Sequence, residues 1–201
     1  MKLTGVMPPI TTPFQDGKVA SDKLKKNFQK WNKTGLSGYL VLGSNGEAVY
    51  LNEKEKIKVA EVSRESIPTS KIMLVGTGME STQETILFTN QMAKMGADCA
   101  LVVTPSYFKG SMKPQILYDH FMAVADSSRI GILIYNVPQF TGINLEPEVV
   151  AKLSEHSNII GIKDSSGNIG QLSEIVHLSQ KEFAIFVGSP PVFFPARCVG
   201  A

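Results

Sequence analysis

The apolar residues of the chain fall into two alternating patterns. Short continuous apolar runs are bounded by glycine, proline or polar residues, and they are followed by longer stretches whose apolar residues recur three or four positions apart. The first pattern predicts strands that helices cover on both faces, and the second predicts amphipathic helices. The predicted strands are residues 5–10, 38–42, 72–76, 99–104, 130–135, 159–163 and 184–188.

Polar residues indicate where several of the helices start. Asn52 with Glu55, and Ser81 with Glu84, have the spacing of a capping box before an apolar stretch. Ser21 is placed to cap a first helix in which Leu24, Phe28 and Trp31 share one face. Further helices are predicted near residues 114–126, 146–155 and 170–180.

Seven strands that alternate with helices at a repeat of about 30 residues favour an α/β fold of the (β/α)₈ TIM-barrel type. A doubly wound sheet is the alternative. Residues 1–201 are expected to form a single barrel domain, because no interior segment has the composition of a linker. The strand count stops at seven, so we expect the chain to lack the eighth strand and the C-terminal helices. Either it is a fragment, or a partner or another segment closes the barrel.

Composition narrows the class of partner. A chain of 201 residues with 43% hydrophobic and 19% charged residues is suited to a globular domain with a sizeable core. The formal net charge is only +2, and the charges are scattered without long runs. Neither nucleic acid nor a membrane is therefore an expected partner, and a small molecule is.

The two cysteines and the first residues of the chain bear on the compartment. Cys99 and Cys198 lack the spacing of a metal site or a disulfide framework, which favours a reducing compartment. The start, MKLTGVMPPITTPF, has neither the apolar core of a signal peptide nor an arginine-rich transit pattern. We expect a cytoplasmic protein, with a mitochondrial location left open for a longer form.

Reactive residues of a barrel lie at the carboxyl ends of its strands, and several strands here end in polar residues. Lys163 closes the apolar run 159–162. Alone it would be a solvated charge, but in low-dielectric surroundings its pKa would fall and leave an amine able to form a Schiff base with a ketone. Tyr135 closes another strand. It would pack as an ordinary aromatic residue, or its phenol would carry protons during imine formation.

The segment GSNGE, residues 43–47, joins a predicted strand to a predicted helix. Ser44 and Asn45 would ordinarily be turn residues. At a helix N-terminus flanked by glycines, however, backbone N–H groups and these two side chains would form a site for a carboxylate. Glu47 is expected to be structural. Together with Lys163 and Tyr135, this segment predicts Schiff-base chemistry on a 2-oxo acid.

Several motifs carry a resemblance to a known family. GSNGE, TPSYF (104–108), YNVP followed by TG (135–142) and GIKDSSG (161–167) occur in this order, and PPITTPF precedes them near the start, so the motifs extend over essentially the whole chain. The chain resembles the dihydrodipicolinate synthase and N-acetylneuraminate lyase family of class I aldolases. The resemblance implies a (β/α)₈ barrel that forms a homo-oligomer, a dimer or a tetramer, and that handles pyruvate without a metal or an organic cofactor.

The resemblance also implies roles for single residues. Lys163 is similar to the Schiff-base lysine of the family and Tyr135 to its proton-relaying phenol. Ser44 and Asn45 match the pair that grips the pyruvyl carboxylate, with the Ser44 hydroxyl also in the relay. Tyr107 matches the tyrosine that members of the family lend to the site of a neighbouring subunit.

The second substrate is suggested by the residues beyond the pyruvate site. Dihydrodipicolinate synthases usually have an arginine just before the TG pair, and Phe140 stands there in this chain. An apolar ring cannot replace a guanidinium as a carboxylate partner, so the chain looks closer to 4-hydroxy-2-oxoglutarate aldolases, which yield pyruvate and glyoxylate. Ser165 and Ser166 are candidate donors for the distal end of such a substrate, and Gly188, which ends the last predicted strand, is a further candidate binding residue.

Three alternatives stay open. The first is a dihydrodipicolinate synthase, now named 4-hydroxy-tetrahydrodipicolinate synthase, and the second is an aldolase for 2-keto-3-deoxy sugar acids; both use the same imine. The third is a catalytically impaired fragment that binds its ligand without transforming it.

Overall fold

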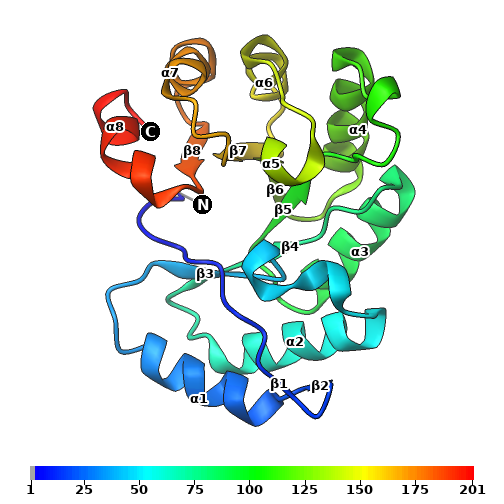
Figure 1. Ribbon diagram of the computed structural model, residues 1–201, viewed down its shortest axis with the longest axis vertical. Helices are drawn as coiled ribbons and strands as arrows, with labels where there is room; N and C mark the ends of the chain where they lie inside the picture. The colour runs from blue at the N-terminus through cyan, green and yellow to red at the C-terminus, as the bar shows by residue number, and fades with distance from the viewer. Residues whose placement is uncertain (1–2) are drawn as a thin grey trace. The chain divides into compact units, whose positions relative to one another are not determined.

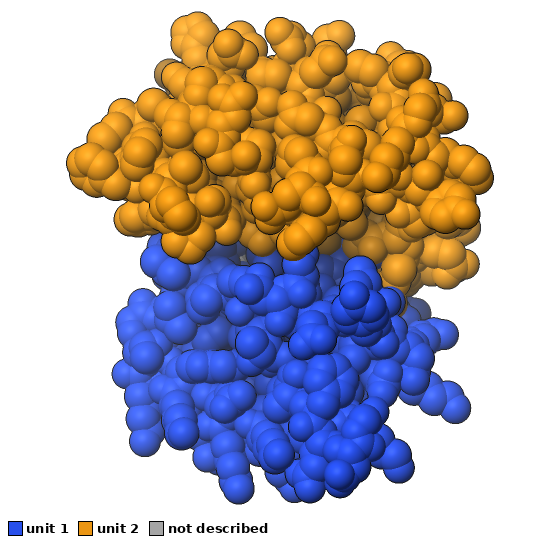
Figure 2. Space-filling view, in the orientation of Figure 1, with its two compact units in different colours: residues 1–77, 90–100 blue, residues 78–89, 101–201 orange. Residues whose placement is uncertain are grey.

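The computed structural model describes residues 3–201 (Figure 1). The chain divides into two compact units, which Figure 2 colours separately. Unit 1 takes in the residues up to 77 and residues 90–100, and unit 2 takes in residues 78–89 and 101–201. Helix α3 (Thr82–Lys94) and strand β5 (Cys99–Val103) each run from one unit into the other.

Unit 1 contains the first elements of the chain. They are β1 (Phe14–Gln15), β2 (Lys18–Val19), α1 (Ser21–Trp31), β3 (Gly38–Val41), the 3₁₀ turns η1 (Ser44–Gly46) and η2 (Ala48–Tyr50), α2 (Glu53–Ser66) and β4 (Ile72–Gly76). Strands β3 and β4 are parallel, with Gly38 opposite Ile72. Helices α1 and α2 pack against each other.

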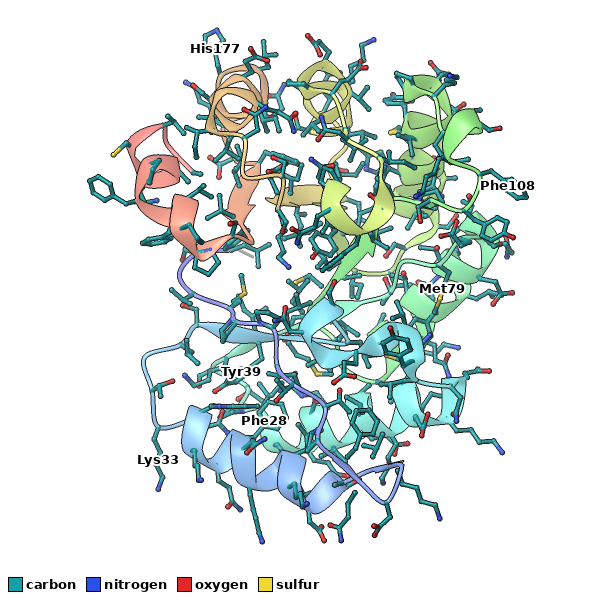
Figure 3. The ribbon with its side chains drawn as sticks, viewed as in Figure 1. Phe28, Lys33, Tyr39, Met79, Phe108 and His177 are labelled. Carbon is teal, nitrogen blue, oxygen red and sulfur yellow. The ribbon has the colours of Figure 1, made fainter. Side chains whose placement is uncertain are left out.

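The predicted apolar face of α1 forms part of the core of unit 1. Phe28 is completely buried and meets the ring of Tyr39 edge to face, with ring centroids 5.3 Å apart (Figure 3). Trp31 contacts Phe28 in the same manner at 5.4 Å. The Tyr39 hydroxyl, the polar group of this aromatic cluster, donates a hydrogen bond to Asn32 and so has a partner although the residue is buried.

The first predicted strand, residues 5–10, is wrong as a continuous strand. Only an isolated parallel bridge joins Pro9 to Leu40. Leu40 N–H donates to the Pro8 carbonyl and Ile10 N–H donates to the Leu40 carbonyl, so the segment does run beside β3. Two consecutive prolines have no N–H to donate, and the ladder is therefore interrupted where the apolar pattern predicted it.

The helix starts were predicted with mixed success. The capping box of Asn52 and Glu55 is confirmed at α2, with both hydrogen bonds present. At α3 the Ser81 hydroxyl accepts from Glu84 N–H, which is one half of the predicted box. The prediction for Ser21 is wrong, because Ser21 is the first residue of α1 and Ala20 occupies the capping position.

A short hairpin formed by β1 and β2 was missed. Its turn consists of Asp16 and Gly17, both with positive φ (51° and 72°). Asp-Gly is the dipeptide that favours this two-residue turn, so the sequence did contain the signal.

Unit 2 contains the remaining elements. They are η3 (Lys109–Ser111), α4 (Pro114–Ser127), β6 (Gly131–Asn136), α5 (Pro138–Thr141), α6 (Pro147–Leu153), β7 (Ile159–Asp164), α7 (Ile169–Leu178), β8 (Ala184–Val187), η4 (Pro190–Val192) and α8 (Phe193–Cys198). Strands β6, β7 and β8 pair in parallel. Helices α4, α6 and α7 lie side by side in Figure 1 and contact one another in that order.

The strand order identifies the fold class. From β3 to β8 the strands stand in the sheet in the order of the chain. A doubly wound sheet reverses its order at a switch point, so this alternative is not supported, and the alternation of strand and helix is that of a (β/α) barrel. The extension of one domain over residues 1–201 stays a prediction. Among residues 3–201, no helix is long and apolar enough to cross a membrane.

Candidate functional site

Lys163 and Tyr135 lie side by side near the carboxyl ends of β7 and β6. The two residues are directly opposite each other in the register of these strands. Residues at the same level of neighbouring strands project to the same face of a sheet. The Lys163 Nζ lies 4.1 Å from the centroid of the Tyr135 ring, within the range of a cation–π contact. The structure thus brings together the predicted nucleophile and the predicted phenol.

Gly188 and Ser165 adjoin the same lysine. A Cβ atom added at Gly188 would lie 2.8 Å from Lys163 Cε and 2.0 Å from the Ser165 hydroxyl oxygen. Both side chains therefore occupy the space that any other residue at position 188 would fill. Four of the predicted site residues, Lys163, Tyr135, Ser165 and Gly188, meet at the ends of β6, β7 and β8.

Tyr107 stands out from its unit on the loop after β5. Its side chain is 79% exposed and contacts Phe108 edge to face, with ring centroids 5.0 Å apart. Its hydroxyl makes no hydrogen bond within residues 3–201. The lending of Tyr107 to a neighbouring subunit stays a prediction.

Glu80, which sequence reasoning did not single out, holds the loop of Tyr107. Its carboxylate accepts hydrogen bonds from the backbone N–H groups of Ser106 and Tyr107, each at 2.8 Å, and from the Ser106 hydroxyl. Three donors on one carboxylate fix the backbone of the loop and leave the Tyr107 ring exposed.

Ser44 and Asn45 belong to unit 1, where they form the 3₁₀ turn η1 after β3. Both side chains are exposed. The expected helix N-terminus is wrong: η1 has three residues, a second 3₁₀ turn follows it, and α2 begins only at Glu53. The N–H groups of Gly46 and Glu47 donate to Gly43 and Ser44, which leaves them unavailable to an anion.

The glycine at position 46 has a structural explanation. A Cβ there would lie 3.0 Å from the Ile10 carbonyl oxygen. The Gly46 carbonyl accepts a hydrogen bond of 2.7 Å from the buried Thr12 hydroxyl, which ties the turn to the segment beside β3. Glu47 has a positive φ of 56° between the two turns, in agreement with the structural role expected of it.

Two buried polar residues of the site were missed. Asn136 and Asp164 follow Tyr135 and Lys163 directly, and they are bonded to each other through Asn136 Nδ2 and Asp164 Oδ2 at 2.7 Å. The sequence signal that could have identified them is the polar residue that stands at the end of each of these two strands. Ser166, expected near the distal end of a substrate, instead donates its hydroxyl to Asp164.

His120 is a buried titratable group away from these strand ends. It lies on α4, and its Nδ1 is 2.8 Å from the Thr82 hydroxyl at the start of α3. Burial lowers the pKa of His120 to about 4, although the charge of Glu80 acts in the opposite direction. The imidazole is therefore neutral at pH 7. Within residues 3–201, no group of three or more histidine, cysteine or acidic side chains is arranged to hold a metal ion.

Comparison with known proteins decides the family. The sequence model described as "Dihydrodipicolinate synthetase family" matches residues 2–201. The chain belongs to this family. A 4-hydroxy-tetrahydrodipicolinate synthase from Methanothrix thermoacetophila is 42% identical over 200 residues, which cover 98% of this chain and 66% of that protein.

Solved structures of family members have the same fold. The 4-hydroxy-tetrahydrodipicolinate synthase of Methylacidiphilum fumariolicum SolV matches with a TM-score of 0.95 at 30% identity, over 100% of this chain and 66% of that one. YagE, a prophage protein of the family from E. coli K12 in complex with pyruvate, matches with a TM-score of 0.93 at 30% identity, over 98% and 67%. The chain thus spans about two thirds of the length of the relatives it matches.

Proposed function

We propose that the chain belongs to a pyruvate-linked class I aldolase that acts as a 4-hydroxy-tetrahydrodipicolinate synthase and condenses pyruvate with aspartate semialdehyde. The observation that carries this proposal is the placement of Lys163 Nζ against Tyr135, in the space that Gly188 leaves open. A primary amine beside a phenol at the ends of parallel strands provides the nucleophile and the proton donor that imine formation requires. The names of the relatives support the synthase over the hydroxyoxoglutarate aldolase that the sequence favoured.

The proposed reaction begins when the unprotonated Lys163 amine attacks the C2 carbonyl of pyruvate. Loss of water from the resulting carbinolamine gives the imine. Loss of a proton from C3 converts the imine to an enamine, and C3 then attacks the aldehyde carbon of the second substrate. Tyr135 donates and accepts the protons of these steps, while Ser44 and Asn45 hold the pyruvyl carboxylate.

One observation favours a second candidate function, the cleavage of 4-hydroxy-2-oxoglutarate. Phe140 lies on α5, directly after β6, and its side chain is 65% exposed. An exposed phenylalanine provides no cation for the distant carboxylate of aspartate semialdehyde. Glyoxylate also has a carboxylate, but this group is bonded directly to the aldehyde carbon, so its binding does not depend on a cation further out. The two reactions share the imine and differ only in the aldehyde, so Phe140 bears on the second substrate alone.

The proposed partners are a 2-oxo acid and further copies of the chain. The exposed pair Tyr107 and Phe108 suits a contact with a neighbouring subunit, because large exposed aromatic side chains are typical of interface cores. A homo-oligomer and a cytoplasmic location stay predictions.

The function is tested by substrate consumption. The protein is mixed with aspartate semialdehyde with and without pyruvate, and separately with 4-hydroxy-2-oxoglutarate. We expect loss of the semialdehyde only when pyruvate is present. Lys163→Ala should abolish it because no imine can form, whereas Lys152→Ala, which removes an exposed lysine of α6, should leave it unchanged. Consumption that persists in Lys163→Ala would contradict the proposed function, and release of pyruvate from hydroxyoxoglutarate alone would favour the second candidate.

A further inference from the structure

The residues that follow Tyr135 and Lys163 form a second pair on the opposite face of the same strands. Asn136 stands directly opposite Asp164 in the register of β6 and β7. Successive side chains of a strand point to opposite faces, so this pair lies behind the Lys163–Tyr135 pair. Asn136 is 0% exposed and Asp164 is 3% exposed.

Every polar group of the Asn136 amide is used. Its Nδ2 donates to Asp164 Oδ2 at 2.7 Å and to Asn144 Oδ1 at 3.0 Å. Its Oδ1 accepts from the backbone N–H of Leu145 at 3.1 Å. This side chain ties β6, β7 and the segment before α6 at a single point.

Asp164 is a buried carboxylate that only hydrogen bonds hold. Besides Asn136, it accepts from the backbone N–H of Ser166 at 2.9 Å and from the Ser166 hydroxyl. Gln171 Nε2 lies 3.5 Å from its Oδ2. No ion pair joins it within residues 3–201, so its burial depends on the exact fit of these donors.

The strand pairing needs such a fixed point. The register of β6 and β7 shifts between Ile132 and Leu133, where Ile159 and then Gly161 are the partners on β7. The pairing at the start of the two strands therefore does not determine the pairing at their carboxyl ends. A slip of one residue would turn Lys163 to the other face of the sheet, and the Asn136–Asp164 bond excludes that slip.

The backbone carbonyls of the same two residues also bond to residues that adjoin Lys163. The Asn136 carbonyl accepts from Ser165 N–H at 2.8 Å, and the Asp164 carbonyl accepts from Gly188 N–H at 2.8 Å. Four of the residues proposed to serve the reaction are thus next to, or bonded to, this pair: Tyr135, Lys163, Ser165 and Gly188.

We propose that Asn136 and Asp164 are positioning residues, whose bond across β6 and β7 aims the Lys163 amine at the 2-oxo carbon of the substrate. This inference rests on the proposed function, because it presupposes that Lys163 forms the imine. Both side chains are buried on the face of the strands opposite Lys163, so we expect neither to touch the substrate. A buried polar pair rarely adds more stability than an apolar pair of the same size, so its expected contribution is geometry.

The test compares the rate of imine formation with thermal stability. Pyruvate is added to the full chain, borohydride traps the imine, and mass spectrometry follows the Lys163 adduct at several pyruvate concentrations. In Asp164→Asn, an amide N–H group replaces the carboxylate oxygen that accepts from Asn136 Nδ2, so two donors face each other and this hydrogen bond is lost. We expect the maximal trapping rate of this variant to fall by about tenfold to a hundredfold, the scale of a misplaced reacting group, with a smaller change in the half-saturating pyruvate concentration.

Two further variants complete the test. The exchange variant Asn136→Asp with Asp164→Asn places the acceptor at position 136 and the donor at position 164, so a hydrogen bond can form again. We expect it to recover most of the trapping rate. Asn158→Ala, at the other end of β7, is the matched control. We expect it to lower the melting temperature, because the Ala125 and Ser128 carbonyls lose their donor, without slowing trapping.

Each outcome has one meaning. If the wild-type chain forms no adduct, the proposed function fails and the positioning role fails with it. If the wild-type chain forms the adduct, but Asp164→Asn slows trapping only as much as Asn158→Ala at equal loss of melting temperature, the positioning role alone is overturned. Should Asp164→Asn not fold, Ser166→Ala removes one donor to Asp164, and an unchanged trapping rate in that variant would overturn the role.

Discussion

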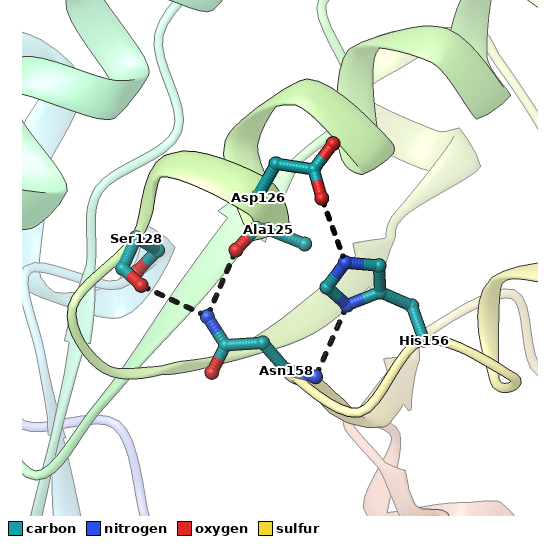
Figure 4. A network of polar contacts seen from close by, with 5 residues as sticks. All are labelled: Ala125, Asp126, Ser128, His156 and Asn158. Atoms are coloured by element: carbon teal, nitrogen blue, oxygen red, sulfur yellow. Dashed lines mark hydrogen bonds and ion pairs between the residues drawn. The ribbon is translucent and has the colours of Figure 1, made fainter.

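Strands β6 and β7 carry a polar network at each end, and the two networks differ in burial and in what they adjoin. The carboxyl-end network is the Asn136–Asp164 pair with its partners, Asn144, Ser166 and Gln171. The amino-end network consists of His156, Asp126 and Asn158 (Figure 4). The central pair of the first network is buried and adjoins Lys163, although its partners are half-buried or exposed. The second network has no fully buried member and joins the last turn of α4 to the start of β7.

The amino-end network is built from bonds between a loop and a helix end. Asn158 Nδ2 donates to the carbonyls of Ala125 and Ser128, at 2.9 and 3.0 Å. Asn158 N–H donates to His156 Nδ1, which leaves Nε2–H to donate to Asp126 at 3.1 Å. None of these residues is near a predicted reactive group.

The difference corresponds to the two ends of a (β/α) barrel. Reactive groups lie at the carboxyl ends of its strands, and interactions at the amino ends serve stability. Networks of similar chemistry at opposite ends of the same two strands therefore have different expected effects. Damage at the carboxyl end should change the reaction more than the stability, and damage at the amino end should do the reverse.

The largest effect expected is on turnover, from Tyr135→Phe. The ring beneath Lys163 Nζ stays, so imine formation should still occur, but the lost phenol should slow turnover by about 10²–10⁴-fold. Steady-state rates with pyruvate and aspartate semialdehyde measure this. Tyr118→Phe on α4 is the control, and an unchanged rate in Tyr135→Phe would remove the phenol from the mechanism.

A smaller effect on the reaction is expected from Gly188→Ala. The added methyl group would overlap the Ser165 hydroxyl and Lys163 Cε, and both side chains would have to move. Because both are flexible, the free energy of unfolding should fall by only about 1 kcal/mol, the low end of the cost of overpacking, whereas adduct formation should slow by about tenfold or more. Gly170→Ala, in the first turn of α7, is the matched control. Equal adduct rates in the two variants would contradict the expectation that changes at the carboxyl end of the strands slow the reaction.

The smallest effect on the reaction is expected from Asn158→Ala. This variant leaves the Ala125 and Ser128 carbonyls without their donor, which should lower the free energy of unfolding by about 1–3 kcal/mol. Denaturant unfolding gives this value, and pyruvate trapping should proceed at the wild-type rate. A slowed reaction would mean that the two ends of β7 are not independent.

Local signals predicted much of the fold. The box of Asn52 and Glu55 depends on residues three apart, and its spacing alone was sufficient. The strand ends of Lys163 and Tyr135 followed from the apolar runs before them. The prediction of a strand over residues 5–10 was wrong because the apolar pattern takes no account of the missing N–H groups of Pro8 and Pro9.

Longer-range features could not be obtained from the sequence. The positive φ of Leu42 and Glu47 changes the expected strand and helix around residues 43–47 into two 3₁₀ turns, and neither residue type indicates it. The bond of Asn136 to Asp164 joins residues 28 positions apart across two strands. Only the register of β6 and β7, shift included, decides that these two side chains meet.

The most direct test of the account is the position of the borohydride-trapped pyruvate adduct in the wild-type chain. The protein is incubated with pyruvate, reduced, digested and mapped by mass spectrometry, with a sample that lacks pyruvate as the control. We expect a pyruvate-dependent adduct on Lys163 and on no other lysine. A folded protein that gives no adduct, or gives it on a different lysine, would contradict the assignment of Lys163 as the nucleophile.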